Sequence, residues 1–237
     1  MKYKAILFDL DGTLLPMDQD QFVKAYFGTI AKELAPYGLS AEQVVNGLGL
    51  GVREMYKNNG DILNKDVFWQ AFAKSVDNKD CSKIIEICDE FYYNNFNSLK
   101  KICGENELAV KAVAAARESA EKVCVATNPI FPDSAQKSRL SWIGLSPDDF
   151  DLVTSYDVDS FCKPNPKYYL SICERIGVKP EDCLMIGNDV KEDMYAATLA
   201  GMDTYLVTDC IIDCDDYKHE GKSGTFKDMI DYLNSLK

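Results

Sequence analysis

The chain has 237 residues, of which 46% are hydrophobic and 27% charged, which suits a globular protein of one elaborated domain or two domains. Its formal net charge of −12 disfavours a nucleic-acid backbone or an anionic membrane surface as the main partner. No apolar run approaches the roughly 18 residues of a membrane span, and the run after Lys4 turns acidic too soon for a secretory signal. We therefore expect a cytoplasmic protein.

The first predicted element is a strand over residues 5–8, the apolar run AILF. A continuous apolar run of this length is typical of a parallel strand that is buried on both faces. Asp9 and Asp11 follow the strand directly, and Gly12 can adopt the turn dihedrals that bring them toward one small volume. Taken alone, this segment is explained equally well by an acidic turn.

The stretch from residue 18 to residue 101 is predicted to be helical, because its apolar residues recur at spacings of three and four. Its segment NGLGLGVREMYK has three glycines that fit neither G-x-G-x-x-G nor a Walker loop. Arg53 in this segment is a candidate for contact with the distal end of a substrate, although a solvated helix charge is the simpler explanation. Three aromatic residues are predicted to pack within this stretch: Tyr92, Tyr93 and Phe96.

The rest of the chain alternates between helix and strand patterns. The predicted elements are a helix over 107–119, a strand over 123–126, a helix over 133–142, a short strand over 152–154, a helix over 165–176 closed by Gly177, a strand over 183–186, a helix over 192–200 capped by Gly201, and a last clear strand over 204–207. This alternation predicts a parallel sheet with right-handed crossovers and helices on both faces. Ligands of such sheets bind at the carboxyl ends of the strands.

Polar residues follow the predicted strands at those ends. Thr127 and Asn128 follow VCVA, Asn188 and Asp189 follow LMIG, and Lys163 precedes a helix in FCKPNP. Each has a simple structural explanation, such as a helix cap, a turn or a surface charge. Their position at matching strand ends, in this order, favours a shared site with the two aspartates of the first segment. Because His219 is the only histidine, this chemistry must depend on carboxylates, lysine and hydroxyls.

The segments FDLDGTLL, VATN, CKPNP and IGNDVKED resemble, in this order, the four motifs of the haloacid dehalogenase superfamily of hydrolases. The resemblance implies an α/β fold, with a Rossmann-like parallel-sheet core and an inserted α-helical cap. The core would comprise residues 1–16 and 102–237, and the cap, which would govern substrate specificity, residues 17–101.

The resemblance also implies separate roles for the two aspartates of the first motif. Asp9 would be the nucleophile that attacks phosphorus and forms an aspartyl phosphate. Asp11 would protonate the leaving alcohol and then deprotonate the hydrolytic water. Family members that act on carbon–halogen bonds lack the second aspartate, so Asp11 favours phosphoryl transfer over dehalogenation.

The other motifs are expected to bind the phosphoryl group. Lys163 and the hydroxyl of Thr127 would hold its oxygens, and Lys163 would also balance the charge of the nucleophile. Gly12 and Asn128, which belong to the same motifs, complete the predicted substrate contacts together with Arg53.

A magnesium ion is the expected cofactor, because a phosphate monoester carries about −1.5 to −2 charges and several carboxylates surround it. The predicted ligands are Asp9, the carbonyl of Asp11 and a residue of the last motif. That motif departs from the commonest pattern, since Asn188 separates Gly187 from Asp189. We favour Asp189 because an anionic oxygen suits the ion better than an amide, with Asn188 as the alternative. Asp193, one helical turn later, is a candidate supporting acid.

The predicted function is magnesium-dependent hydrolysis of a small phosphorylated metabolite by a monomer or weak homodimer. A phosphosugar mutase would use the same two aspartates but return the phosphoryl group to its substrate. A catalytically idle binding or regulatory protein with the same pocket is the alternative from a different functional class.

Overall fold

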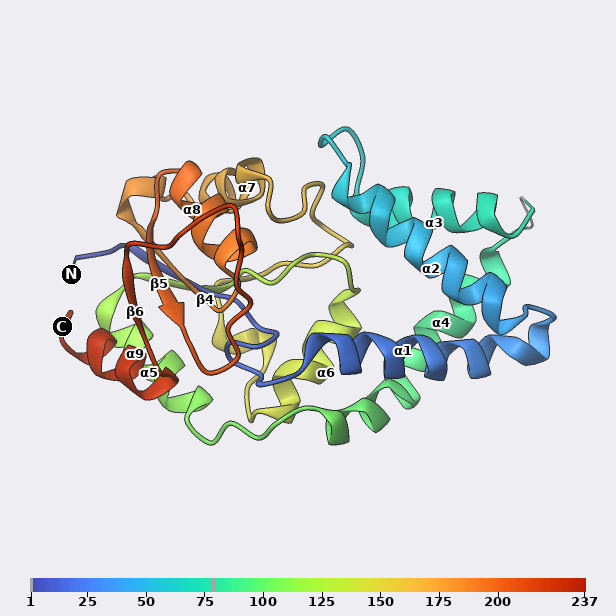
Figure 1. The fold of residues 1–237 in the computed structure, drawn as a ribbon, viewed down its shortest axis with the longest axis horizontal. Coiled ribbons are helices and arrows are strands. Elements are labelled where there is room, and N and C mark those ends of the chain that lie inside the picture. Colours follow the sequence, from blue (N-terminus) through green and yellow to red (C-terminus); the bar gives the residue numbers. More distant parts are fainter. Residues whose placement is uncertain (1, 78–79) are drawn as a thin grey trace.

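The computed structural model describes residues 2–77 and 80–237, and its centre is a parallel β-sheet (Figure 1). Within these residues the sheet has six strands in the order β3-β2-β1-β4-β5-β6. The strands are β1 (Ala5–Phe8), β2 (Lys122–Val125), β3 (Leu152–Val153), β4 (Cys183–Gly187), β5 (Asp203–Val207) and β6 (Lys222–Gly224). Every neighbouring pair is parallel, as the sequence predicts, so the carboxyl ends of all strands lie at one edge.

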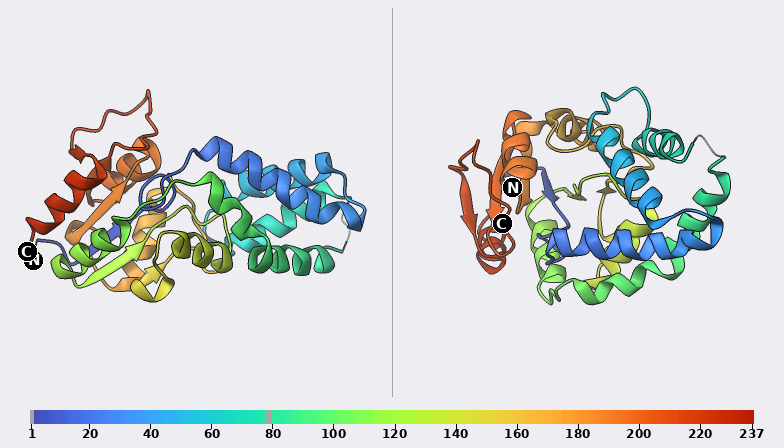
Figure 2. Two further views of the ribbon diagram at one scale, coloured as in Figure 1. Left: turned by 90° about the horizontal axis from the view of Figure 1, so that it is seen from below. Right: turned by 45° about the vertical axis from the view of Figure 1, so that its right-hand side comes forward.

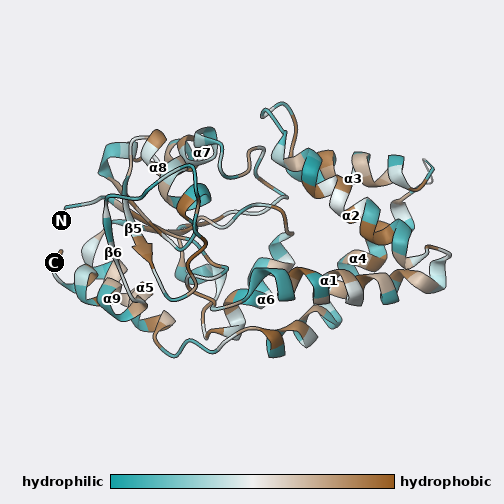
Figure 3. Ribbon diagram, viewed as in Figure 1, coloured by the Kyte–Doolittle hydropathy of each residue, from teal (hydrophilic) through white to brown (hydrophobic). Residues whose placement is uncertain are grey.

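Helices cover both faces of the sheet. They are α5 (Ala109–Ser119), α6 (Asp133–Trp142) and α9 (Phe226–Asn234) on one side and α7 (Pro166–Ile176) and α8 (Ala196–Leu199) on the other. Alternate residues of β1 pack into different core clusters, Ile6 and Phe8 into one and Ala5 and Leu7 into the other. In Figure 3 the ribbon of β5 is largely hydrophobic, whereas the helices around the sheet carry both hydrophilic and hydrophobic residues. The apolar run of β1 is therefore buried on both faces, as predicted.

Four further helices form a separate group that projects away from the sheet (Figure 2). They are α1 (Gln19–Leu34), α2 (Ala41–Tyr56), α3 (Asn64–Ser75) and α4 (Ser82–Asn94), followed by a 3-10 segment over Phe96–Ile102. The amide of Gly104 donates to the carbonyl of Pro16 at 2.7 Å, so the chain leaves and rejoins the sheet region at one place. No helix in the described part of the chain has the length and hydropathy of a membrane span.

The structure extends the predicted pattern at the carboxyl end. The last strand predicted from the sequence corresponds to β5, and two further elements, β6 and α9, follow β5 in the structure. β6 has only three residues, KSG, and lacks the apolar pattern on which the strand predictions relied. α9 begins at a capping box formed by Thr225 and Asp228, a helix-start signal that was present in the sequence.

The predicted helix over 192–200 is also different in detail. Residues Val190–Tyr195 form a π-helical turn, and α8 follows it. In this wider turn the amide of Met194 donates to the carbonyl of Asp189 at 3.2 Å, five residues earlier. The carboxylate of Asp193 consequently points back toward the end of β4, where it accepts the amides of Asn188 and Asp189, both at 3.0 Å. Such π-turns frequently accompany functional sites.

The glycine-rich segment of α2 is explained by its packing against α3. A Cβ atom on Gly47 or Gly51 would lie only 2.8 Å from the Phe72 ring or 2.4 Å from the Phe68 ring, respectively. A Cβ on Gly49 would have no atom within 4 Å. Two of the three glycines therefore allow α2 and α3 to approach closely, and the third faces open space.

This asymmetry gives a matched pair of substitutions. We expect Gly51→Ala to lower the free energy of unfolding by about 1–3 kcal/mol, because the new methyl group displaces the Phe68 ring. Gly49→Ala should instead raise it by about 0.5–1 kcal/mol, because alanine loses less conformational entropy in a helix. Urea unfolding monitored by circular dichroism measures both, and equal effects of the two substitutions would contradict the packing explanation.

Candidate functional site

A cleft of about 110 Å³ lies at the carboxyl ends of β1, β2 and β4. Five of the predicted site residues line it: Asp9, Asp11, Thr127, Asn128 and Asp189. They come from three different segments of the chain and meet because the three strands end at the same edge. The helical group also contributes to the wall of this cleft through side chains of α1 and α2.

Asp9 is held at the end of β1 by backbone and side-chain contacts. Its amide donates to the carbonyl of Ile186 at 2.8 Å, which continues the pairing of β1 with β4 by one residue. Its carboxylate, in a residue only 6% exposed, accepts from Lys163 Nζ at 2.8 Å on Oδ1 and from the Thr13 hydroxyl at 3.1 Å on Oδ2. The orientation of this carboxylate is therefore fixed from both sides.

The ammonium of Lys163 lies between two carboxylates. It donates to Asp9 Oδ1 at 2.8 Å and to Asp193 Oδ1 at 2.6 Å, and all three residues are buried. Burial alone would lower the pKa of Lys163, but the Asp193 and Asp9 carboxylates outweigh burial and hold that pKa well above its usual range. Lys163 is thus a permanent positive charge beside Asp9.

Asp11 has a partner that the sequence analysis missed. Arg139, a fully buried residue of α6, forms an ion pair with Asp11 Oδ2, and its guanidinium lies 4.6 Å from the centre of the Phe131 ring. Burial raises the pKa of Asp11, while Arg139 acts in the opposite direction. The other oxygen of Asp11, Oδ1, is buried without a hydrogen-bond partner. The sequence did contain a signal for this pair. Arg139 comes four positions after Ala135, on the same face of the predicted helix, and a charged residue on a buried face needs a partner.

Gly12 and Asn188 form a close contact beneath the cleft. Gly12 has a φ of +90°, and a Cβ atom there would lie 2.3 Å from Asn188 Nδ2. Asn188 accepts from the Thr13 hydroxyl at 2.9 Å and donates to the carbonyl of Cys210 at 2.6 Å. Its side chain therefore connects the loops after β1, β4 and β5, and it is not among the residues that line the cleft.

The last motif presents one acidic side chain to the cleft. Asp189 lines it together with Asp9 and Asp11, and its Oδ1 caps the π-turn by accepting the amides of Lys191 at 2.8 Å and Glu192 at 2.7 Å. Asp193, in contrast, is 1% exposed, and its oxygens are used by Lys163 and two backbone amides. Asp193 therefore supports Lys163 and the turn after β4, as expected of a supporting acid, and it does not line the cleft.

The oxygen groups at the cleft suit a hard cation. Asp9 and Asp189 supply carboxylates, and the carbonyl of Asp11 lies in the same loop as Asp9. Across residues 2–77 and 80–237 no three His, Cys, Asp or Glu side chains gather into a metal site. A cation held here would therefore depend on carbonyl and water oxygens in addition to two carboxylates, which is the usual coordination of Mg²⁺ in phosphate-processing sites.

A hydrogen-bonded triad connects the two parts of the molecule and was also missed. Asn128 Nδ2 donates to the Tyr56 hydroxyl at 2.9 Å and to Glu192 Oε2 at 3.0 Å, and the Tyr56 hydroxyl donates to Glu192 Oε1 at 3.0 Å. Burial raises the pKa of Glu192 to about 7. Because Tyr56 is the last residue of α2, this triad attaches the helical group to the edge of the sheet.

Of the two remaining residues predicted to contact a substrate, Thr127 lines the cleft and Arg53 does not. Thr127 is 2% exposed and lines the cleft, and its carbonyl accepts from the hydroxyls of Thr154 and Tyr168, both at 2.7 Å. Arg53 is exposed on α2 and does not line the cleft. Its contact with a substrate stays a prediction without support from the geometry.

Comparison with known proteins gives a match over most of the chain. A family model described as haloacid dehalogenase (HAD)-like hydrolase matches residues 3–201. The glyceraldehyde 3-phosphate phosphatase of Methanothermobacter thermautotrophicus is 28% identical over 240 residues, covering 99% of this chain and 98% of the relative. The phosphoglycolate phosphatase of Nitrosospira multiformis is 25% identical over 205 residues, covering 86% and 82%. The crystal structure of a HAD phosphatase from Thermococcus onnurineus has the same fold, with a TM-score of 0.60, 22% identity and 97% coverage of both chains.

The buried ion pair of Arg139 and Asp11 can be tested by a double-mutant cycle. We expect Arg139→Met to lower the free energy of unfolding by about 3 kcal/mol, because it leaves a largely buried carboxylate without its counter-charge. In the Asp11→Asn background the same substitution should cost at least about 1 kcal/mol less. Arg117→Met, which breaks the more exposed pair with Asp151, is the control and should cost at most about 1 kcal/mol. Urea unfolding measures all four variants, and equal costs of Arg139→Met in both backgrounds would rule out the coupling.

Proposed function

The chain belongs to the haloacid dehalogenase-like hydrolases, and from this we propose that it is a phosphatase that hydrolyses a small phosphomonoester with the help of Mg²⁺. The observation that carries the proposal is that Asp9 and Asp11 line one cleft, with Lys163 buried against Asp9 and Arg139 paired with Asp11. The names of the relatives include different phosphorylated substrates, and these support the reaction class rather than a particular substrate.

Asp9 is the proposed nucleophile. Its carboxylate oxygen forms a bond to phosphorus, and the bond between phosphorus and the leaving alcohol oxygen breaks. The fixed contacts of Asp9 with Lys163 and Thr13 support this role, because they orient the carboxylate before the substrate arrives. Lys163 stays charged and offsets the negative charge that gathers around the phosphoryl group.

Asp11 is the proposed proton carrier. It donates its proton to the leaving alcohol and later removes a proton from the water that attacks the phosphorus of the aspartyl phosphate. In that second step the bond between phosphorus and the Asp9 oxygen breaks, and inorganic phosphate leaves. Two features support the role: the burial that raises the pKa of Asp11, which favours the protonated form, and Arg139, which orients the carboxyl group.

The metal and the remaining contacts complete the proposal. Mg²⁺ would be held by Asp9, Asp189 and the Asp11 carbonyl, and when bound it would polarise the phosphoryl oxygens and offset the charge of the carboxylates. Thr127 and Lys163 would bind phosphoryl oxygens. Asn128 adds an acceptor for a substrate hydroxyl or amine, since its buried Oδ1 has no partner.

Residues 17–101 are proposed to act as a cap over the cleft, with residues 1–16 and 102–237 as the core. Two contacts support this division. The hydrogen bond between Gly104 and Pro16 brings the two connecting segments together, and Tyr56 reaches from α2 to the cleft. A cap in this position would exclude water during the reaction.

The nucleophile assignment gives a direct prediction. Asp9→Asn should reduce kcat by about a thousandfold or more, because an amide does not form the covalent intermediate. Asp11→Asn should reduce it by about 10²–10⁴-fold through loss of acid–base catalysis. Phosphate release from an aryl phosphate measures turnover, and circular dichroism checks the fold. Asp148→Asn, at an exposed position, is the matched control, and full activity of folded Asp9→Asn protein would exclude the covalent mechanism.

The metal assignment is tested by removing and restoring the ion. Treatment with EDTA should abolish phosphate release, and added Mg²⁺ should restore it, because Lys163 alone does not balance a phosphate dianion together with the carboxylates that surround it. In Asp189→Asn the Mg²⁺ concentration for half-maximal activity should rise about tenfold or more, since one anionic ligand is lost. An unchanged metal requirement in Asp189→Asn, together with a raised one in Asn188→Ala, would assign the ligand to Asn188 instead.

A further inference from the structure

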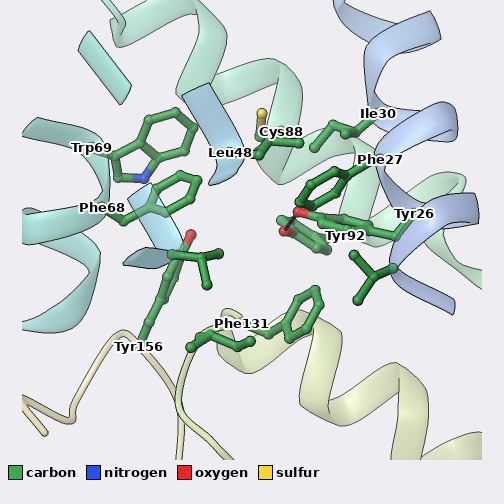
Figure 4. Close-up of a pocket in the computed structure, with 13 residues that line it drawn as sticks. Tyr26, Phe27, Ile30, Leu48, Phe68, Trp69, Cys88, Tyr92, Phe131 and Tyr156 are labelled. Atoms are coloured by element: carbon green, nitrogen blue, oxygen red, sulfur yellow. Dashed lines mark hydrogen bonds between the residues drawn. The ribbon is translucent and has the colours of Figure 1, made fainter. Parts of the chain in front are cut away.

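An apolar cavity of about 100 Å³ lies within the helical group, next to the candidate site. Figure 4 shows side chains of α1, α2, α3 and α4 turned toward one another around it, with Phe131 and Tyr156 on the side of the sheet. Thirteen residues form its lining, and none of them is Asp, Glu, Lys, Arg or His. Aromatic rings of α1, α3 and α4, including Phe27, Phe68 and Trp69, form much of the wall.

Two polar atoms of this wall are already paired with each other. The hydroxyls of Tyr26 and Tyr92 share a hydrogen bond of 2.6 Å. A carboxylate or a second phosphate placed here would lose its hydration without gaining a counter-charge, which is strongly unfavourable. The cavity is therefore suited to an apolar group and not to the anionic end of a metabolite.

The cavity adjoins the cleft at the strand ends. Val23, Ile130 and Phe131 line both spaces. Phe131 also lies against the guanidinium of Arg139, which is paired with the proposed proton carrier Asp11. A substrate whose phosphoryl group lies at Asp9, with its leaving oxygen toward Asp11, would thus direct the rest of its alcohol past Phe131 and into the cavity.

We propose that the ester hydrolysed here carries a compact, branched alkyl group on its leaving alcohol, and that this cavity binds that group. The inference rests on the proposed phosphatase function and adds the substrate class. An apolar cavity of about 150 Å³ binds benzene, so the present volume of about 100 Å³ suits a group smaller than a benzene ring. Tyr92 is buried within the helical group, as predicted, and also lines this cavity. Tyr93 is 73% exposed and does not pack inside the group, contrary to the prediction.

The experiment compares methyl, ethyl, propyl and isobutyl phosphate as substrates. Each added carbon that enters the cavity should raise kcat/KM about fourfold, so isobutyl phosphate, with three more carbons, should exceed methyl phosphate by about sixtyfold. Glyceraldehyde 3-phosphate and phosphoglycolate, which appear in the names of the two relatives, should be poorer substrates than isobutyl phosphate. Values of kcat/KM that agree within about threefold across the alkyl series, with methyl phosphate turned over, would overturn the proposal.

Two valines of α2 provide a matched pair of variants. Val52 lines the cavity, and Val52→Phe should fill it, lowering kcat/KM for isobutyl phosphate about tenfold or more while changing that for methyl phosphate less than about twofold. Val45 is 40% exposed on the same helix and does not line the cavity, so Val45→Phe should leave both values unchanged. Phe27→Leu, which enlarges the cavity, is the second variant should Val52→Phe fail to fold, and it should shift the preference toward 3-methylbutyl phosphate. Equal effects at positions 52 and 45 would overturn the assignment.

A binding measurement separates this inference from the function on which it rests. Isobutylphosphonate and methylphosphonate cannot be hydrolysed at the carbon–phosphorus bond, and calorimetric titration with Mg²⁺ present gives their affinities. We expect the isobutyl compound to bind at least tenfold more tightly, and Val52→Phe to remove the difference. Equal affinities would overturn the cavity assignment. Retained discrimination between the phosphonates, without phosphate release from any ester, would overturn the phosphatase function and leave the cavity assignment intact.

Discussion

The candidate site depends on the buried ion pairs of the Lys163 ammonium with Asp9 and Asp193. Asp9 directly follows an apolar strand and is almost fully buried, and a buried carboxylate is costly without a nearby positive charge. Lys163 supplies that charge, and Asp193 balances it from the opposite side. The π-turn after β4 turns the Asp193 carboxylate toward this position. The end of β1, the loop that carries Lys163 and the π-turn after β4 therefore contribute to one arrangement of three charged groups, which fixes the direction of the Asp9 carboxylate.

The sequence predicted the parts of the fold that local patterns encode. The strands β1, β2 and β4 are apolar runs followed at once by polar residues, and the order of the sheet brings those residues to one edge. The fold class predicted from the family motifs agrees with the parallel sheet and its separate helical group. Asp9, Asp11, Thr127 and Asp189 meet at the cleft for this reason.

The features that the sequence did not reveal depend on contacts between distant segments. Arg139 meets Asp11 across 128 positions, and nothing in its own helix indicates which carboxylate it will pair with. The Tyr56 contact with Glu192 arises only when α2 approaches the sheet. The edge strand β6 is polar and three residues long, so its conformation is set by pairing with β5 rather than by its own composition. The apolar cavity likewise exists only between helices.

The hydrogen bond between Gly104 and Pro16 has a consequence for how such a protein can change during evolution. A segment whose two ends meet can be lengthened, shortened or exchanged while the sheet keeps its geometry, because the entropy of closing a loop grows only slowly with its length. Mutations in α1–α4 can therefore reshape the part of the cleft wall that these helices contribute without moving the residues at the strand ends. A lineage could in this way acquire new substrates while inheriting its chemistry unchanged.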